Sequence, residues 1–321
     1  MHRIAVAVLA VLAAAVASPA WSQAWPSKPV RVVVNFPPGG AADNLMRALA
    51  PRLQEAFGQP FVVENRPGAN GSIGAGEIAK AAPDGHSILM SSGGAIALNG
   101  LIYNNLGYDP MKALDPVAPV AVVSVFLEIQ PSIPAATLAE FIAHVRANPG
   151  KLNYGSPGNG SSPHLAGEMF NRAAKIQTTH VPYKGAGPAM TDLLGGQLHF
   201  MFDPGIGLQH VRSGKLRMLA VGSPKRHPAW PDVPTVAEVV GGEFDTDTVF
   251  GLYAPAGTPK DVIARLNQEV TRLMQGGPMA ERVAAIGATG LQLTPEAFVA
   301  RVRAEHARMA GLVKEIGLKA N

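Results

Sequence analysis

The chain has 321 residues, of which 47% are hydrophobic and 16% charged, and it contains no cysteine. Its net charge of +4 comes from 27 Lys and Arg against 23 Asp and Glu, without runs of like charge. This excludes a nucleic-acid-binding surface but suits small anionic ligands. The lack of cysteine excludes disulfides and a cysteine-linked lipid anchor. The length is sufficient for two lobes, each with its own core.

The first 24 residues have the pattern of a secretory signal peptide. His2 and Arg3 form a short basic start, and residues 4–17 are apolar but too few to span a bilayer comfortably. Small-x-Ala sites end at Ala20 and Ala24. We expect cleavage after Ala24 and export to the periplasm as a protein that is not membrane-embedded. An uncleaved membrane anchor is the less favoured alternative.

In the first part of the mature chain, short apolar runs alternate with segments of helical periodicity, which is typical of a parallel α/β sheet. The expected strands are 32–34, 61–63 and 87–90. The expected helices cover 45–57 and a short segment ending near residue 82. Residues 117–129 are apolar and long enough to cross between two lobes.

A second α/β unit follows this crossing. Its expected helices are 137–147, 163–174 and 188–194, and its expected strands are 152–154, 180–183, 198–202 and 218–221. Residues 250–254 predict a return crossing, because two long amphipathic helices, 259–274 and 295–316, follow it. Two crossings imply two hinge strands and a ligand site between the lobes. We predict lobe one from 25–126 plus 248–321 and lobe two from 127–247.

Two glycine-rich turns, each opening a helix, are the most informative local feature. The first contains Gly39 and Gly40, and the second contains Gly158 and Gly160. Glycine allows close approach of a ligand to the backbone, and a helix start offers unpaired N–H groups and partial positive charge. We expect the two turns to hold a carboxylate from both sides. Gly40→Val and Gly160→Val should abolish binding, since a branched Cβ obstructs the approach and resists positive φ.

Many short segments, taken in order, resemble one family. They include FPPGG at 36–40, VENRPGA at 63–69, NPGKLNYGS at 148–156, HVPYKG at 180–185 and APAGTP at 254–259. From Trp25 to the C-terminus the chain resembles the Bug-type (TctC-like) extracytoplasmic solute-binding receptors of tripartite tricarboxylate transporters. The resemblance implies a type-II periplasmic binding protein fold, α/β with two lobes of mixed or parallel sheet joined by two hinge strands. It further implies a monomer without enzymatic activity, which closes on a small carboxylate and delivers it to membrane transporter subunits.

The resemblance also implies a set of ligand-binding residues. Those in lobe one are Phe36, Pro38, Gly39, Gly40, Ala41, Asp43, Ser92 and Ala95. Those in lobe two are Gly158, Asn159, Gly160, Ser161, Ser162 and Asp203. Two of these positions have an equally ordinary structural interpretation: Asp43 as an acid in a first helical turn, and Ser161 as an N-cap. No cofactor or metal is expected, since the nine histidines form no ligand-spaced pair.

The chain departs from the family pattern at positions that concern the ligand. Ala41 and Ala42 stand where the family often has Ser or Thr, and Glu128 stands on the crossing where an apolar residue is usual. For Glu128 a structural role is favoured over contact with the ligand. We hypothesise a mono- or dicarboxylate with an apolar or aromatic body, next to the ring of Phe36, and consider citrate less suitable.

Parts of the sequence fit two other functions. An exported hydrolase could use Ser161 with His164 and Asp203, but no Gly-x-Ser-x-Gly elbow surrounds the serine, and Ser161 and His164 share one helical turn. A sensor subunit that presents its ligand to a signalling partner stays open, because closed lobes serve both roles. A loose dinucleotide fingerprint at 74–79 lacks its acidic residue.

Overall fold

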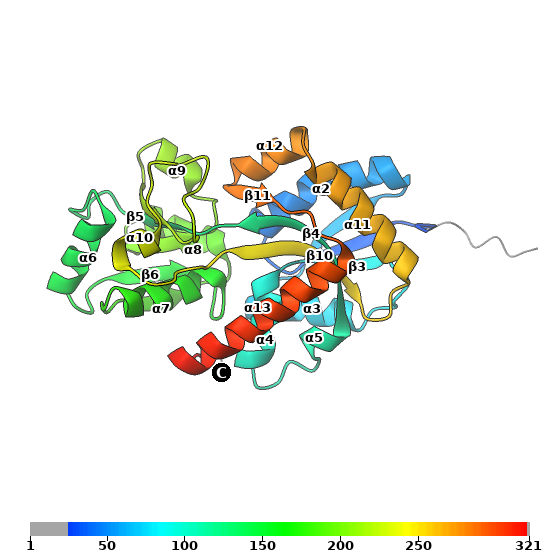
Figure 1. The fold of residues 1–321 in the computed structure, drawn as a ribbon, viewed down its shortest axis with the longest axis horizontal. Coiled ribbons are helices and arrows are strands. Elements are labelled where there is room, and N and C mark those ends of the chain that lie inside the picture. The colour runs from blue at the N-terminus through cyan, green and yellow to red at the C-terminus, as the bar shows by residue number, and fades with distance from the viewer. Residues whose placement is uncertain (1–24, 320–321) are drawn as a thin grey trace, which may run out of the picture.

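The structure, a computed structural model, describes residues 25–319, so the expected signal peptide and its cleavage site lie outside the described residues. Two β-sheets, each with helices on both faces, form two lobes that are joined by extended strands (Figure 1). Lobe one is built on the six-stranded sheet and lobe two on the five-stranded sheet. None of the helices within 25–319 combines the length and the apolar composition needed to cross a membrane.

The sheet of lobe one is covered by six main helices. Its strands are, in spatial order, β11 (Ala288–Gly290), β4 (Leu114–Val123), β10 (Thr248–Pro255), β3 (Ser87–Ser92), β1 (Val30–Val34) and β2 (Phe61–Asn65). One face packs against α2 (Ala41–Phe57), α11 (Lys260–Met274) and α12 (Pro278–Ala285). The other packs against α3 (Ser72–Ala79), α4 (Gly93–Ile102) and α13 (Pro295–Ile316). The short η1 (Ala69–Gly71) and α5 (Pro110–Ala113) lie in the connections.

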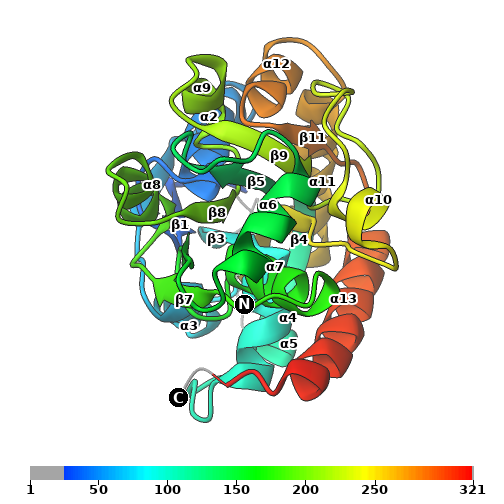
Figure 2. The ribbon, with the colours of Figure 1, turned by 90° about the vertical axis from the view of Figure 1, so that its left-hand side faces the viewer.

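The sheet of lobe two is smaller. Its order is β7 (Thr179–Pro182), β6 (Asn153–Ser156), β8 (Phe200–Asp203), β5 (Phe126–Ile129) and β9 (Arg217–Val221). One face packs against α6 (Leu138–Ala147), α7 (Ser162–Ala173) and α10 (Val236–Val240). The other packs against α8 (Ala186–Leu194) and α9 (Leu208–Arg212). Figure 2 looks onto this lobe and shows α6 and α7 in front.

The two sheets share one topology. In each, three parallel strands lie beside a strand that runs antiparallel to both of its neighbours, which is β10 in lobe one and β5 in lobe two. Each of these antiparallel strands enters its sheet directly from a crossing between the lobes. This is the order of the type-II periplasmic binding proteins, and the predicted fold class is confirmed.

The hinge consists of two extended segments, which Gly222, directly after β9, bridges through main-chain hydrogen bonds. β4 passes into β5 through Ser124 and Val125, and the return segment reaches β10 at Thr248, which lies opposite Val123. Gly222 donates to the Val125 carbonyl at 2.8 Å, and Thr246 donates to the Gly222 carbonyl at 3.0 Å. Two crossings are therefore present as predicted, but the return crossing precedes residues 250–254, which already pair with β3 and β4 in the sheet of lobe one.

Several strands formed where the sequence predicted them because their apolar runs are buried on both faces of the sheet, as in β1, β3 and β8. Val32, Val33 and Val34 in β1 are each fully buried. The helix α4 was not predicted. Eight of its ten residues are buried, so it shows no polar face that would reveal a helical period, and its N-cap Ser92 accepts from the Ala95 N–H at 3.1 Å. The short strand β11 was also not predicted.

Candidate ligand-binding cleft

A cavity lies between the lobes at the carboxyl ends of the parallel strands. Lobe one contributes the β1–α2 turn, the start of α4 and the first residues of β10, and lobe two contributes the starts of α7 and α8 together with Pro204. The sequence-predicted residues in its lining are Phe36, Pro38, Gly40, Ala41, Ser92, Ala95, Ser161 and Ser162. The remaining predicted residues, which do not line the cavity, are Gly39, Asp43, Gly158, Asn159, Gly160 and Asp203.

Four helix N-termini converge on this cavity. In lobe one they belong to α2 and α4, and in lobe two to α7 and α8, with first-turn residues of each in the lining. Each N-terminus carries partial positive charge on its unpaired N–H groups. The cavity therefore attracts an anion from both lobes at once.

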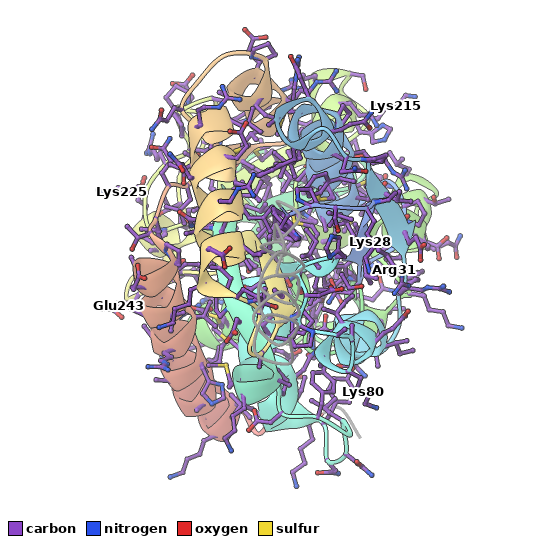
Figure 3. All side chains as sticks on the ribbon, turned by 90° about the vertical axis from the view of Figure 1, so that its right-hand side faces the viewer. Lys28, Arg31, Lys80, Lys215, Lys225 and Glu243 are labelled. Atoms are coloured by element: carbon purple, nitrogen blue, oxygen red, sulfur yellow. The ribbon has the colours of Figure 1, made fainter. Side chains whose placement is uncertain are left out.

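Charged side chains take no part in the lining that the described residues form. The polar side chains there are those of Asn70, Ser92, Ser161, Ser162 and Thr248. Lysines such as Lys28, Lys80 and Lys215 lie on the outside of the molecule instead (Figure 3). Positive potential in the cleft thus comes from the main chain and not from an arginine or lysine.

Two of the four helices begin without a side-chain cap. Ser161 caps α7 by accepting from the His164 N–H, as Ser92 does for α4, whereas the N-caps of α2 and α8 are Gly40 and Gly185. The main-chain N–H groups of Ala41, Ala42, Ala186 and Gly187 have no acceptor within residues 25–319. A carboxylate in the cleft would supply the missing acceptors.

The glycine-rich turn of lobe one uses its own amides internally. The Gly39 N–H donates to the Asp43 carboxylate at 2.9 Å, and the Gly40 N–H points to the Pro37 carbonyl at 3.4 Å. Gly39 has φ +79°, but Gly40 has φ −76°, so the expectation that Gly40 resists side chains through positive φ is wrong. The free amides are those of the next residues, in the first turn of α2.

Asp43 braces this turn from behind. It is 2% exposed and accepts from the Gly39 N–H, from Arg47 Nε and from Asn65 Nδ2, each at 2.9 Å. Burial alone would raise the pKa of Asp43, but the hydrogen bonds from Arg47, Gly39 and Asn65 outweigh burial and hold the pKa below its ordinary value. The carboxylate is therefore ionised and fixes the start of α2.

The glycine-rich turn of lobe two is likewise held from within its lobe. Gly160 has φ +79° and donates its N–H to His164 Nδ1 at 3.0 Å, while the Gly158 N–H donates to Ser156 Oγ at 3.2 Å. Asn159 lies between them without reaching the lining. The N–H groups of Asn159 and Ser162 in this turn have no acceptor within residues 25–319, and of these two residues Ser162, the first of α7, lines the cavity.

Two stacked histidines support this second turn. The rings of His164 and His180 have centroids 3.8 Å apart and are inclined by 13°, and His180 Nε2 lies 2.6 Å from Ser156 Oγ. Burial lowers the pKa of His164, and burial together with the neighbouring His164 lowers the pKa of His180 to about 3. Both rings are neutral at pH 7, as the Gly160 N–H···Nδ1 bond requires.

The hydrogen bonds around Ser161 do not form the proton-transfer pair of serine and histidine that a hydrolase would need. Its Oγ donates to the Gly158 carbonyl at 2.7 Å and accepts from the His164 N–H, and His164 Nδ1 is occupied by the Gly160 N–H. Within the described chain no hydrogen bond joins the Ser161 hydroxyl to the imidazole ring of His164. Ser161 is a helix cap.

The lobes also touch directly beside the cavity. Asn70 Nδ2 donates across the cleft to the Gly160 carbonyl at 2.9 Å, and the Ser162 and Thr248 hydroxyls share a hydrogen bond. Gly185 lies so close to Pro37 that an added Cβ would come within 2.5 Å of its ring. The sequence analysis did not predict a role for Asn70 or for the start of α8. For α8 the available signal was Gly185, a glycine that follows β7 and directly precedes the helix.

The two-lobed fold with an uncharged cleft lined by helix N-termini defines a solute-binding protein of the periplasmic binding protein class. The family model described as tripartite tricarboxylate transporter family receptor matches residues 45–318. The chain belongs to this family, as its sequence motifs predicted. Members of the family are receptors and not enzymes, so the hydrolase alternative is not supported.

Relatives of known sequence or structure match along nearly the whole chain. Protein BugT of Bordetella pertussis is 37% identical over 319 residues, which cover 98% of both chains. The structure of Rpa4515 of R. palustris with adipate superposes with a TM-score of 0.89 at 35% identity, covering 92% of this chain and 99% of that one. MatC (Rpa3494) of Rhodopseudomonas palustris with bound malate gives a TM-score of 0.84 at 32% identity, covering 90% and 100%.

Proposed function

We propose that the protein captures a small carboxylate between its lobes in the periplasm and delivers it to the membrane subunits of a tripartite tricarboxylate-type transporter. The lobes that close would be 25–126 plus 248–321 and 127–247, in a receptor acting as a monomer. The observation that carries the proposal is the convergence of four helix N-termini on a cavity without charged lining side chains. Family membership and the carboxylates bound by two similar structures support it.

In this proposal the carboxylate caps the two helices that lack a capping side chain. Its oxygens accept from the first-turn amides of α2, at Ala41 and Ala42, and of α8, at Ala186 and Gly187. A hydrogen bond to a charged group contributes about 1.5–3 kcal/mol. Three or four such bonds contribute about 4.5–12 kcal/mol before the cost of ordering the ligand, a range that includes the roughly 8 kcal/mol of micromolar affinity.

The rest of the cavity suits an apolar ligand body. The rings of Phe36 and Phe250 lie 6.5 Å apart at the cavity wall, and Val123 and Val125 of the hinge complete this side. Ala41 and Ala42 offer no hydroxyl groups. A ligand with many hydroxyl or carboxyl groups would leave polar groups unpaired here, which is costly. We therefore propose a mono- or dicarboxylate with an apolar or aromatic body in preference to citrate.

Differential scanning fluorimetry with a panel of carboxylates tests this proposal. The panel contains citrate, malate, adipate and aromatic acids. An acid with an apolar body should raise the midpoint of unfolding and bind at one molecule per chain in calorimetry. Tight binding of citrate together with no response to any apolar or aromatic acid would contradict the proposed ligand class. Stabilisation by cationic or neutral solutes alone would contradict carboxylate capture itself.

A further inference from the structure

Two carboxyl groups lie buried together in lobe two, behind the cleft. Glu128 on β5 and Asp203 at the end of β8 are both fully buried. β5 and β8 are antiparallel, with Phe126 opposite Asp203 and Glu128 opposite Met201. The two acids are therefore two positions apart on neighbouring strands and project from the same face of the sheet, toward α8 and α9.

Three of their four oxygen atoms have no partner within the described chain. Asp203 Oδ2 accepts from the Gly205 N–H at 2.7 Å and from the Gly207 N–H at 2.8 Å. Asp203 Oδ1 and both Glu128 oxygens are buried without a hydrogen bond. An ionised carboxylate in that position is strongly disfavoured, so an unpaired acid of this kind takes up a proton.

No cation among residues 25–319 balances the two acids. The residues that pack against the two acids are Met190 of α8, Met201 and Gly207. A Cβ added to Gly207 would come within 2.1 Å of Glu128 Oε2. The charged or titratable side chains on the elements that pack against the two acids have other partners. Asp192 accepts from the Tyr183 hydroxyl, and Arg212 lies over Trp230. Arg217 donates to the carbonyls of Ile133 and Ala135, and His210 is half-buried on α9. The described residues also contain no cluster suited to a metal ion.

Burial, and after it the neighbouring Asp203, raises the pKa of Glu128 well above its ordinary value. Burial likewise raises the pKa of Asp203, to about 7, against the opposing effect of the Gly207 and Gly205 amides. Those two amides stabilise the charged form of Asp203, and no group does the same for Glu128 within the described chain. The proton therefore belongs on Glu128.

We propose that Glu128 and Asp203 form a proton-binding site, in which a protonated Glu128 donates a hydrogen bond to Asp203 Oδ1. The pair then carries one negative charge, which the Gly205 and Gly207 amides share. The step is a simple acid–base equilibrium, with the proton taken from water at low pH and returned to water at high pH.

The site lies beneath a loop that borders the cleft. Pro204 is part of the cavity lining, and Gly205 packs against the Ile286 carbonyl of lobe one, where an added Cβ would come within 2.0 Å. Loss of the proton places two like charges under this loop, and their repulsion disturbs it. The link to the cleft rests on the proposed function, whereas the proton site itself does not.

Infrared difference spectroscopy of the ligand-free protein tests the site. Wild-type protein at pH 7 should show the carbonyl-stretching band of a protonated carboxylic acid, shifted in D₂O. Glu128→Gln should remove this band, and Asp203→Asn should keep it, because Glu128 stays buried and neutral there. Glu168→Gln serves as the control, since Glu168 accepts from the Tyr154 hydroxyl elsewhere in lobe two and should leave the band unchanged.

Unfolding by denaturant at several pH values gives a second measurement. A carboxyl with a raised folded-state pKa stabilises the fold fully at low pH, and this stability is lost as pH rises through the folded-state pKa. The stability of wild-type protein relative to Glu128→Gln should fall as pH rises from about 4, the ordinary pKa of a carboxyl, through the folded-state pKa, which is about 7 for Asp203. Glu128→Leu replaces Glu128→Gln if the latter does not fold. A folded wild-type protein without the acid band at pH 7, or a band that survives in both Glu128 variants, overturns the proposal. No ligand is used, so neither result depends on the proposed transport function.

Discussion

The side-chain amide of Asn70 in lobe one donates to the main-chain carbonyl of Gly160 in lobe two over 2.9 Å. Asn70 is held in place for this contact: it has a left-handed backbone with φ +48°, and Asn99 accepts from its amide at 2.8 Å and donates to its carbonyl at 2.9 Å. A non-glycine residue in this conformation carries strain. This hydrogen bond joins the two lobes and must break if they separate, so we predict that Asn70 acts as a latch.

The latch predicts that Asn70→Gly weakens ligand retention. Glycine accepts the left-handed backbone, so the change removes the amide and not the loop conformation. Loss of one hydrogen bond, about 1 kcal/mol, should weaken binding roughly fivefold, mostly through faster dissociation. Stopped-flow measurement of dissociation of a carboxylate found by the fluorimetry screen checks this. Asn104→Gly, at an exposed position, is the control, and an unchanged dissociation rate in Asn70→Gly would exclude the latch.

Gly160→Val should obstruct closure of the lobes. A Cβ at Gly160 would come within 2.2 Å of Ile102 Cδ1 across the cleft, and the residue has φ +79°. The obstruction arises between lobes, so each lobe should still fold. Small-angle scattering should then show no decrease in radius of gyration at a ligand concentration that compacts the wild-type protein.

A matched control separates obstruction from backbone strain. Gly150 has φ +70° in a turn of lobe two, with no atom within 4 Å of an added Cβ. Gly150→Val carries similar strain without a contact between lobes, and it should compact normally. If Gly160→Val compacts as Gly150→Val does, the two loops do not meet in the closed state. Gly40→Val should be milder than the sequence implied, because Gly40 has an extended backbone and its added Cβ meets only the Pro37 carbonyl, at 3.4 Å.

The fold could be predicted from the sequence because its parallel strands leave a direct signal. Val32, Val33 and Val34 are buried on both faces of a sheet, so they form an uninterrupted apolar run followed by an amphipathic helix. The crossings were recognisable for the same reason, since β4 and β10 are buried along most of their length. Helix α4 escaped detection because burial on nearly all sides removes the amphipathic period.

The site was harder to predict, because its chemistry resides in the main chain. The start of α8 is Ala186-Gly187-Pro188, which carries no polar side chain and looked like an ordinary helix start. The glycine-rich turns indicated the right region, but the N–H groups of Gly39 and Gly160 donate hydrogen bonds to Asp43 and His164 and are not available to a ligand. Which amide remains free depends on such contacts between residues four positions apart, and composition does not reveal them.

The stacked histidines predict a loss of stability in acid. A base whose folded-state pKa is lowered contributes stability above its unfolded pKa, and this stability is lost as pH falls. For His180 the window extends from about 6.5 in the unfolded chain toward about 3 in the folded protein. Denaturant unfolding at pH 7, 5 and 4 should show a steeper decline for wild-type protein than for His180→Gln, in which the side chain does not titrate. Equal declines would show that the ring does not couple folding to protonation.

The proposal that main-chain amides hold the carboxylate predicts that Ala41→Pro weakens binding strongly. Ala41 is the first residue of α2, where proline is well tolerated, and the preceding Gly40 has the extended ψ of 172° that a residue before proline prefers. The change therefore deletes one N–H and preserves the helix. Loss of a hydrogen bond to a charged group, about 1.5–3 kcal/mol, corresponds to a roughly 10- to 150-fold rise in Kd.

Two controls make this measurement specific. Lys260→Pro places proline at the first residue of α11, which does not line the cleft, and should leave both the unfolding midpoint and the Kd near wild type. Ala41→Val adds volume at the same position but keeps the N–H, so it reports the steric contribution alone. Calorimetry should rank Ala41→Pro well below Ala41→Val in affinity. If the two variants bind equally, crowding and not the missing amide explains the loss, and the carboxylate is held elsewhere in the cleft.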